Sequence, residues 1–167
     1  VREVFVSQIN EWFNGVVKKD SFSTKKIIAG FLEGKTDDIQ LELTMFLGET
    51  ISMLDTKARN EEKEIFYYGI LLGLLRCESE WLIQSNIESG DGFVDILVEP
   101  EDPDAGIIME LKYAQNFQDL EKACNKAMNQ IHDRRYNERL RNEGRNNILA
   151  YGIAFCKKRC KVVVKRL

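Results

Sequence analysis

A change of hydrophobic period near residue 80 is the feature that most constrains the fold of this chain. Asn60 followed by two glutamates predicts the start of a helix, and the run "EIFYYGILLGLLRC" is apolar nearly all round, which is typical of a buried helix. In "EWLIQSNIES" the period changes to two, with Trp81, Ile83 and Ile87 in alternation, and this pattern predicts a strand. The chain therefore passes from a buried helix directly into a sheet.

Further strands follow in a regular order. "SGDG" at residues 89–92 predicts a hairpin turn, "FVDILVEP" a second strand that stops at Pro100, and "IIMELKYA" a third strand after an acidic loop. Helical spacing returns from Leu120 to about Leu140, and "NILAYGIAFCKK" and "KVVVKRL" predict two closing strands. This order of helix, three antiparallel strands, helix and strand pair predicts an α/β fold in which helices flank a mixed sheet.

The N-terminal third is expected to be helical. Apolar residues have helical spacing over residues 3–19, and two further helices are expected, one ending at Glu33 and one beginning at Thr36. We therefore divide the chain into a helical lead-in, residues 1–56, that packs on a core domain, residues 57–167.

The stretch "AGFLEGKT" satisfies the loose form of a phosphate-binding loop. Such a loop curls main-chain amides around a phosphate and needs small, uncharged residues, whereas this one would hold Phe31, Leu32 and Glu33. A helix that ends at Glu33, with Gly34 as a left-handed cap, explains the same letters. Nucleotide binding that depends on Lys35 is not expected.

Composition limits the remaining classes of site. The four cysteines form no C-x-x-C pair and the chain has one histidine, so a zinc site is poorly supported and reduced thiols are expected. The longest apolar run, residues 69–75, is too short to cross a bilayer. We expect a cytoplasmic location with no membrane contact. Because the chain starts at Val1, we treat it as a segment of a longer protein.

The net charge of −3 hides a split along the chain. Residues 112–167 hold 14 Lys and Arg against 5 Asp and Glu, whereas residues 1–111 hold 10 against 22. The C-terminal part is suited to facing a polyanion such as nucleic acid. Solvated basic faces on helices and strands explain the same split equally well.

Two acids stand out in otherwise apolar predicted strands, Asp95 and Glu110. A carboxylate in such a strand is costly to bury unless it is paired or holds a cation. Lys112 leaves the same strand face as Glu110, and Asp95 is expected on the neighbouring strand. Two acids and a lysine suit a hard divalent cation. On spacing alone, a structural Lys–carboxylate pair at a strand end is the better explanation.

The sequence motifs around these residues favour the metal site over the structural ion pair. The pattern "SGDGFVDILVEP … GIIMELKYA" resembles the PD-(D/E)XK nuclease superfamily, in particular the group found as C-terminal domains of predicted prokaryotic AAA-type ATPases. The family's Asp matches Asp95, and its acid-x-Lys motif matches Glu110-Leu111-Lys112. In "EIFYYGILLGLL" the helix acid of the family falls at Glu64, while Tyr68 replaces the usual His.

The resemblance extends over nearly the whole chain. "AMNQIHDRRY" matches the helix that follows the last motif strand and supplies Gln130 and Tyr136, and "YGIAFCKKRC" matches the closing strand pair. "GKTDDIQ" and "SMLD" match the helical lead-in of the same group. The resemblance implies a restriction-endonuclease-like core.

It also implies roles for individual residues. Asp95 and Glu110 would bind Mg²⁺ or Mn²⁺, with the Leu111 carbonyl as an extra ligand. Lys112 would be the catalytic lysine. Glu64 would hold a second metal or a water, or else be a surface residue in the first turn of its helix.

Substrate contacts are expected on the following helix. Gln130 and Tyr136 would bond a phosphate oxygen or an active-site residue, or else belong to an ordinary polar helix surface. Arg134 and Arg135, with Arg139, continue the same helix and would grip backbone phosphates.

Two functions follow from the resemblance. The first is a metal-dependent nuclease that hydrolyses nucleic-acid phosphodiester bonds, DNA rather than RNA, with a P-loop ATPase domain in the same longer chain. The second is a catalytically weak or inactive module of the same fold that recognises nucleic acid or protein and is attached to that ATPase. The intact acid and lysine set favours the enzyme, and the negative overall charge favours the module.

Overall fold

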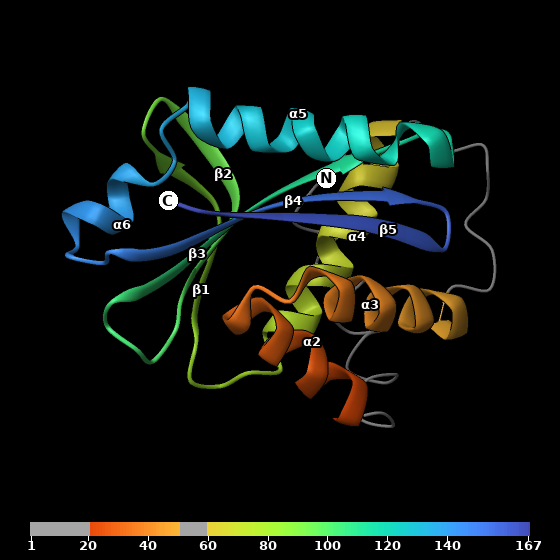
Figure 1. Ribbon diagram of the computed structural model, residues 1–167, viewed down its shortest axis with the longest axis horizontal. Helices are drawn as coiled ribbons and strands as arrows, with labels where there is room; N and C mark the ends of the chain where they lie inside the picture. Colours follow the sequence, from red (N-terminus) through yellow and green to blue (C-terminus); the bar gives the residue numbers. More distant parts are fainter. Residues whose placement is uncertain (1–20, 51–59) are drawn as a thin grey trace.

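A computed structural model of the chain describes residues 21–50 and 60–167, and the helix expected over residues 3–19 lies outside them (Figure 1). The helices are α2 (Ser21–Glu33), α3 (Thr36–Thr50), α4 (Asn60–Leu75), α5 (Leu120–Asp133) and α6 (Glu138–Asn142), with a short 3-10 helix η1 (Phe117–Asp119). The strands are β1 (Leu82–Ser89), β2 (Gly92–Glu99), β3 (Ala105–Tyr113), β4 (Asn147–Cys156) and β5 (Arg159–Arg166). Among the described residues, no helix has the length and apolar character needed to cross a membrane.

The five strands form one mixed sheet in the order β1-β2-β3-β4-β5. Neighbouring strands are antiparallel except β3 and β4, which run parallel and are connected through α5 and α6. This topology confirms the expected α/β fold, because a parallel pair needs a crossover on one face of the sheet. In Figure 1, α5 lies on one side of the sheet and α2 and α3 lie on the other, and α4 shares a core with α2 and α3.

The β2–β3 ladder is short. It contains three pairs, from Val98 with Ile107 to Ile96 with Met109, whereas β3 pairs with β4 along its whole length. Continued by one residue, the same register would bring Asp95 opposite Glu110. The two strands therefore separate at the two acids that the sequence singled out.

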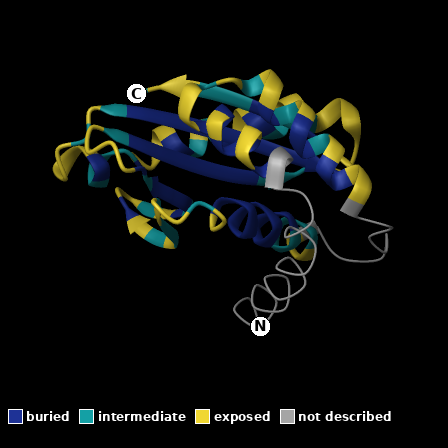
Figure 2. Cartoon of the chain, turned by 90° about the horizontal axis from the view of Figure 1, so that it is seen from below, coloured by how far each residue is buried: buried dark blue, intermediate teal, exposed yellow. Residues whose placement is uncertain are grey.

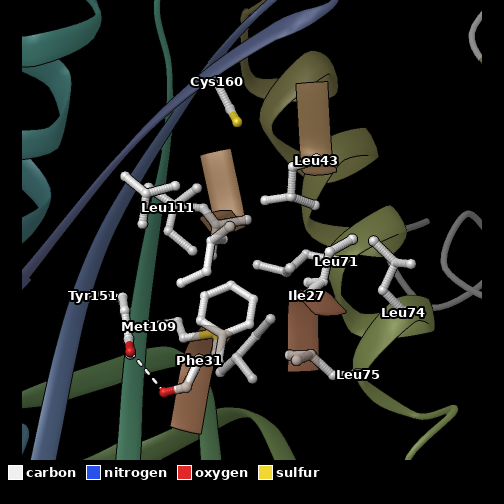
Figure 3. Packing of buried hydrophobic residues seen from close by; sticks show 14 of the residues in the cluster. Ile27, Phe31, Leu43, Leu71, Leu74, Leu75, Met109, Leu111, Tyr151 and Cys160 are labelled. Carbon is white, nitrogen blue, oxygen red and sulfur yellow. Dashed lines mark hydrogen bonds between the residues drawn. The ribbon is translucent and has the colours of Figure 1, made fainter. Parts of the chain in front are cut away.

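The sheet carries a separate apolar cluster on each face. The larger cluster packs α2, α3 and α4 against the side chains of Ile107, Met109 and Leu111 (Figure 3). The smaller cluster packs Ile131 of α5 and other residues against Ile108 and its neighbours. Figure 2 shows the result, with α4 and the inner strands buried and the outer surfaces exposed. Side chains therefore alternate between two cores along β3, and Glu110 and Lys112 share the parity of Ile108.

The "AGFLEGKT" stretch belongs to this core. Phe31 is fully buried, and its carbonyl accepts a hydrogen bond of 2.6 Å from the Tyr151 hydroxyl (Figure 3). Gly34 has a φ of 75° and follows the last residue of α2, as expected of a left-handed cap. Lys35 pairs with Glu33 at 2.5 Å. The stretch forms the end of a helix, so it does not form a phosphate-binding loop.

Helix α5 is shorter than the sequence predicted. It ends at Asp133, not near Leu140, because Arg135 adopts a left-handed φ of 52°. The Tyr136 amide donates to the Ile131 carbonyl and the Arg135 amide to the His132 carbonyl, which is the Schellman pattern of helix ends. Tyr136 therefore lies in the turn before α6, and so do Arg134 and Arg135, instead of on one continuous helix.

The side chains of strand β1 switch from one face of the sheet to the other along its length. Strict alternation would place Trp81, Ile83 and Ile87 on one side, but the first two pack on the larger cluster and Ile87 packs on the smaller one. Asn86 explains the change, because its φ of 51° turns the strand between them. In the β1–β2 register Asn86 lies opposite Asp95, so the turn of the backbone occurs beside the candidate site.

Candidate active site

Asp95 is held at the point where β2 and β3 separate. Its Oδ2 accepts a hydrogen bond of 2.9 Å from the main-chain amide of Leu111. If β2 and β3 stayed paired at this point, a main-chain carbonyl of β2 would accept the hydrogen bond of the Leu111 amide. The side chain of Asp95 thus replaces main-chain pairing and comes to lie beside the Glu110-Leu111-Lys112 segment.

Glu110 and Lys112 form an ion pair on the same face of β3. Lys112 Nζ donates to Glu110 Oε1 at 2.7 Å, and the two side chains are 15% and 2% exposed. Glu110 Oε2 is one of two buried side-chain polar atoms that have no hydrogen-bond partner in the described part of the chain. A buried carboxylate oxygen without a partner carries a desolvation cost that a cation would relieve.

The charges of this group are strongly coupled. Burial, together with the negative charge of Asp95, raises the pKa of Glu110 to about 7, although Lys112 opposes the rise. Burial alone would lower the pKa of Lys112, but the attraction of Glu110, with Glu64 and Asp95, outweighs burial and raises it. Lys112 therefore stays charged, and the surrounding carboxylates would still attract a further cation.

Glu64 approaches the same residues from the second turn of α4. Its Oε2 accepts a hydrogen bond of 3.2 Å from the Tyr113 amide at the end of β3. Burial raises the pKa of Glu64, and Asp95 adds to the rise while Lys112 opposes it. Within residues 21–50 and 60–167, however, no three His, Cys, Asp or Glu side chains are arranged as a metal-binding group. Glu64 lies beside the acid pair and does not complete a triad with it.

The residues present fit a hard divalent ion. Mg²⁺ commonly binds one or two carboxylates and keeps several waters, so the pair of Asp95 and Glu110 is sufficient. Glu110 Oε1 accepts a hydrogen bond from Lys112, while Oε2 has no partner within residues 21–50 and 60–167. The carbonyl of Leu111 belongs to the residue whose amide binds Asp95, so it is close enough to be considered with them.

Gln130 and Tyr136 meet at the start of β2. Gln130 Nε2 donates to the Tyr136 hydroxyl at 3.2 Å, and that hydroxyl donates to the Phe93 carbonyl at 2.8 Å. The Tyr136 carbonyl in turn accepts from Ser89 Oγ at 2.7 Å. Tyr136 is only 2% exposed. These contacts tie the α5–α6 turn to β2, two residues before Asp95.

The two arginines lie at the β1–β2 turn, away from the acid pair. Arg135 donates to both carboxylate oxygens of Asp91, at 3.0 and 3.1 Å, and also pairs with Glu138. Arg134 donates to the Asp91 carbonyl at 3.0 Å. Tyr68, at the position of the family histidine, is 4% exposed and lies in the larger core.

Two anchors of this site have no signal in the sequence. The amides of Leu111 and Tyr113 hold Asp95 and Glu64, but every residue except proline carries such an amide. Only the separation of β2 and β3 reveals that the Leu111 amide is available to a side chain.

Comparison with known proteins agrees with this geometry. No protein with a curated description matches the chain. The family model of the PD-(D/E)XK nuclease superfamily matches residues 62–165, well over half of the chain, and this range includes Glu64, Asp95, Glu110 and Lys112. With the mixed sheet and the acid-x-Lys segment at the separated strands, the match establishes that the chain belongs to the PD-(D/E)XK nuclease superfamily.

Proposed function

We propose that this domain is a divalent-metal-dependent nuclease that hydrolyses phosphodiester bonds in nucleic acid, with DNA preferred over RNA. Members of the superfamily generally use divalent metal ions, and the nuclease fold implies nucleic-acid binding. The observation that carries the proposal is that Glu110 Oε2 is buried without a hydrogen-bond partner among the described residues, while the amide of the next residue, Leu111, donates to Asp95. A purely structural Lys–carboxylate pair would have no need of the second acid.

Asp95 and Glu110 would hold Mg²⁺ or Mn²⁺, with the Leu111 carbonyl as a further ligand. When bound, the ion supplies positive charge that polarises the phosphodiester and makes a nearby water more acidic. Lys112 would orient the attacking water and offset the negative charge that develops on the phosphate. Glu64, with its raised pKa, would hold a water on the α4 side of the site.

Gln130 and Tyr136 would support the reaction indirectly, by positioning the strand that carries Asp95. Their hydrogen bonds hold the Phe93 carbonyl, and so fix the start of the strand that carries Asp95. Arg134 and Arg135 remain proposed contacts for substrate phosphates near the β1–β2 turn. For Arg135 this requires exchange of Asp91 for a phosphate.

A P-loop ATPase domain in the same longer chain is the proposed partner. The support is the likeness of "GKTDDIQ" and "SMLD" to the lead-in segments of ATPase-associated members. A longer form of the chain that contains such a domain would test it, since ATP hydrolysis would then accompany or regulate cleavage.

The test is cleavage of plasmid and of single-stranded DNA in Mn²⁺ and in Mg²⁺. Wild type would be compared with Asp95→Ala, with Lys112→Ala and with Glu101→Gln, a control acid that is exposed in the loop between β2 and β3. Cleavage lost in the first two variants and kept in the control is the expected result. Cleavage that survives Asp95→Ala would overturn the site. No cleavage by any folded form would favour the inactive recognition module.

A further inference from the structure

A strip of aromatic and basic side chains borders the candidate site, and we name it the aromatic–basic strip. It contains Lys63, Tyr113, Phe117, Lys157 and Arg159. Lys63 Nζ lies 5.1 Å from the centre of the Tyr113 ring. Lys157 Nζ and the Arg159 guanidinium carbon lie 5.9 and 4.6 Å from the centre of the Phe117 ring. Cations therefore gather on both rings.

The Tyr113 end of the strip is rigid. The Tyr113 ring stacks on Tyr67 with centroids 5.9 Å apart, and Tyr67 stacks on Phe155 at 4.7 Å. The Tyr67 hydroxyl donates to the Lys157 carbonyl at 2.5 Å, which fixes the β4–β5 turn beside the stack. The Tyr113 end of the strip is thus held in place by the core and by the β4–β5 turn.

Phe117 is a large apolar residue that is exposed to solvent, and core packing does not account for it in the described part of the chain. Its side chain is 44% exposed, and η1, on which it lies, contains no buried residue. It borders a groove of about 680 Å³ whose lining also includes Gln40, Thr44, Gln118 and Arg159, with Asp37 and Glu121 on its walls. A large exposed ring beside two cations, at the rim of a groove, is suited to a flat anionic ligand.

The strip adjoins the catalytic candidates. Tyr113 follows Lys112 in β3, and its amide binds Glu64, the residue next to Lys63. Phe117 follows Lys112 by five residues, so the two Cα atoms are at most roughly 18 Å apart. In Figure 1 the β4–β5 turn and the start of α5 lie at the same end of the sheet. A strand that passes over Phe117 can reach Lys112 within a few nucleotides.

The charge of this region favours a polyanion. Residues 144–167, which include the β4–β5 turn, contain no Asp or Glu and seven Lys or Arg. The nearest acid on η1 is Asp119, whose carboxylate accepts a hydrogen bond from Asn116 at 3.1 Å. Phosphates that run along the turn would meet positive charge at Lys157 and Arg159.

We propose that the aromatic–basic strip binds an unpaired nucleic-acid strand, with a base stacked on Phe117 and phosphates held by Lys157, Arg159 and Lys63. The inference rests on the proposed nuclease function and specifies its substrate as single-stranded, or as a duplex with an unpaired end. Stacking on an aromatic side chain requires the open face of a base, which a duplex interior does not offer. A groove that served duplex alone would need the cations but not the ring.

The test measures binding by fluorescence anisotropy in EDTA, so that no cleavage occurs. The probes are a labelled 20-nucleotide oligothymidine and a blunt 20-base-pair duplex. Phe117→Ala should weaken oligothymidine binding roughly five- to a hundredfold, the effect of losing one base stack, while Phe117→Trp should retain it. The matched control is Lys165→Gln, an exposed cation at the far end of β5, for which a change within about twofold is expected.

Arg159→Gln provides a second measurement. Loss of one phosphate contact should reduce the slope of log affinity against log salt by about 0.7 for the single strand. Circular dichroism and urea unfolding would verify that each variant folds, which the exposure of Phe117 favours.

The inference is overturned if Phe117→Ala binds oligothymidine like the Lys165→Gln control, or if wild type binds the duplex more tightly than the single strand. Metal-free binding separates this result from the proposed function. Wild type that cleaves DNA while Phe117→Ala binds normally would overturn the strip alone. Strand binding that depends on Phe117, without cleavage in Mn²⁺, would support the strip and contradict the nuclease.

Discussion

Asp95 on β2 accepts a hydrogen bond from the Leu111 amide on β3, at the point where the two strands stop pairing with each other. Leu111 lies between Glu110 and Lys112, so this bond couples one acid of the candidate site to the backbone that carries the other acid and the lysine. The spacing of the group is set by main chain and is not left to flexible side chains. This relationship makes the site sensitive to single substitutions.

Replacing Lys112 by Met should damage both activity and folding. The variant leaves Glu110 buried without its cation, a change that costs about 3–5 kcal/mol in typical buried pairs. Cleavage should fall by roughly 10²–10³-fold, because a positive charge near the reacting phosphate is lost. Urea unfolding at pH 8 and initial cleavage rates would measure the two effects, with Lys165→Met as the exposed control. The double variant Glu110→Gln/Lys112→Met should recover stability but not activity, and a double variant as unstable as the single one would contradict the explanation.

The unfolding free energy of the metal-free chain should depend on the protonation of Glu110. Its pKa is raised from an ordinary 4.5 to about 7, first by burial and then by Asp95, so the folded chain holds this proton more tightly than the unfolded chain. The stabilising contribution is fully present below about pH 4.5 and is lost as the pH rises through about 7. Glu110→Gln removes this loss.

Urea unfolding in EDTA between pH 5 and pH 8 would measure the effect. Stability of Glu110→Gln relative to wild type should increase across this range. Parallel pH profiles for the two proteins would show that Glu110 does not titrate in this window.

The architecture and the acid–lysine group followed from the sequence because they depend on simple periodicity. Alternation in β3 determines that Glu110 and Lys112 leave one face, whatever the rest of the fold does. The turn residues at 89–92 and the Gly34 cap also acted locally, and each has the conformation that its residue type favours.

Features that depend on rare backbone conformations were not predicted from the sequence. α5 ends because Arg135 adopts a left-handed φ, at a position where glycine is the usual signal. Asn86 turns β1 in the same conformational region. Arginine gives no signal of this geometry, and asparagine, which adopts it more often than most residues, lay within an alternating pattern that predicted a regular strand. We therefore predicted a helix that continued past Tyr136 and a β1 strand that kept to one face. The hydrogen bond from Tyr136 that holds the start of β2 depends on the first of these, because the turn at Arg135 places Tyr136.

Tyr136→Phe should test that support. Removal of the hydroxyl leaves the Phe93 carbonyl and the Gln130 amide without their partner, in a region where Tyr136 is almost fully buried. An unsatisfied buried polar group costs about 1–3 kcal/mol, so the unfolding free energy should fall by that amount. Gln130→Ala should cost less, because the tyrosine hydroxyl keeps its bond to Phe93. Urea unfolding of both variants would measure the difference, and equal costs would mean that the bond from Tyr136 to the Phe93 carbonyl adds nothing to stability.

Addition of Mn²⁺ should stabilise wild type and should not stabilise the variants that lack a carboxylate. A ligand that binds only the folded chain raises its unfolding free energy by about 2.7 kcal/mol when present at a hundred times its dissociation constant. The ion would supply the missing partner of Glu110 Oε2, so most of this gain should vanish in Glu110→Gln and in Asp95→Ala. Glu64→Gln should retain more of it, because Glu64 is bonded to the Tyr113 amide and lies outside the acid pair. Thermal unfolding with Mn²⁺ and with EDTA would measure the shift without any substrate. Equal stabilisation of Asp95→Ala and wild type would mean that the ion binds elsewhere, and would remove the physical basis for assigning metal ligands to β2 and β3.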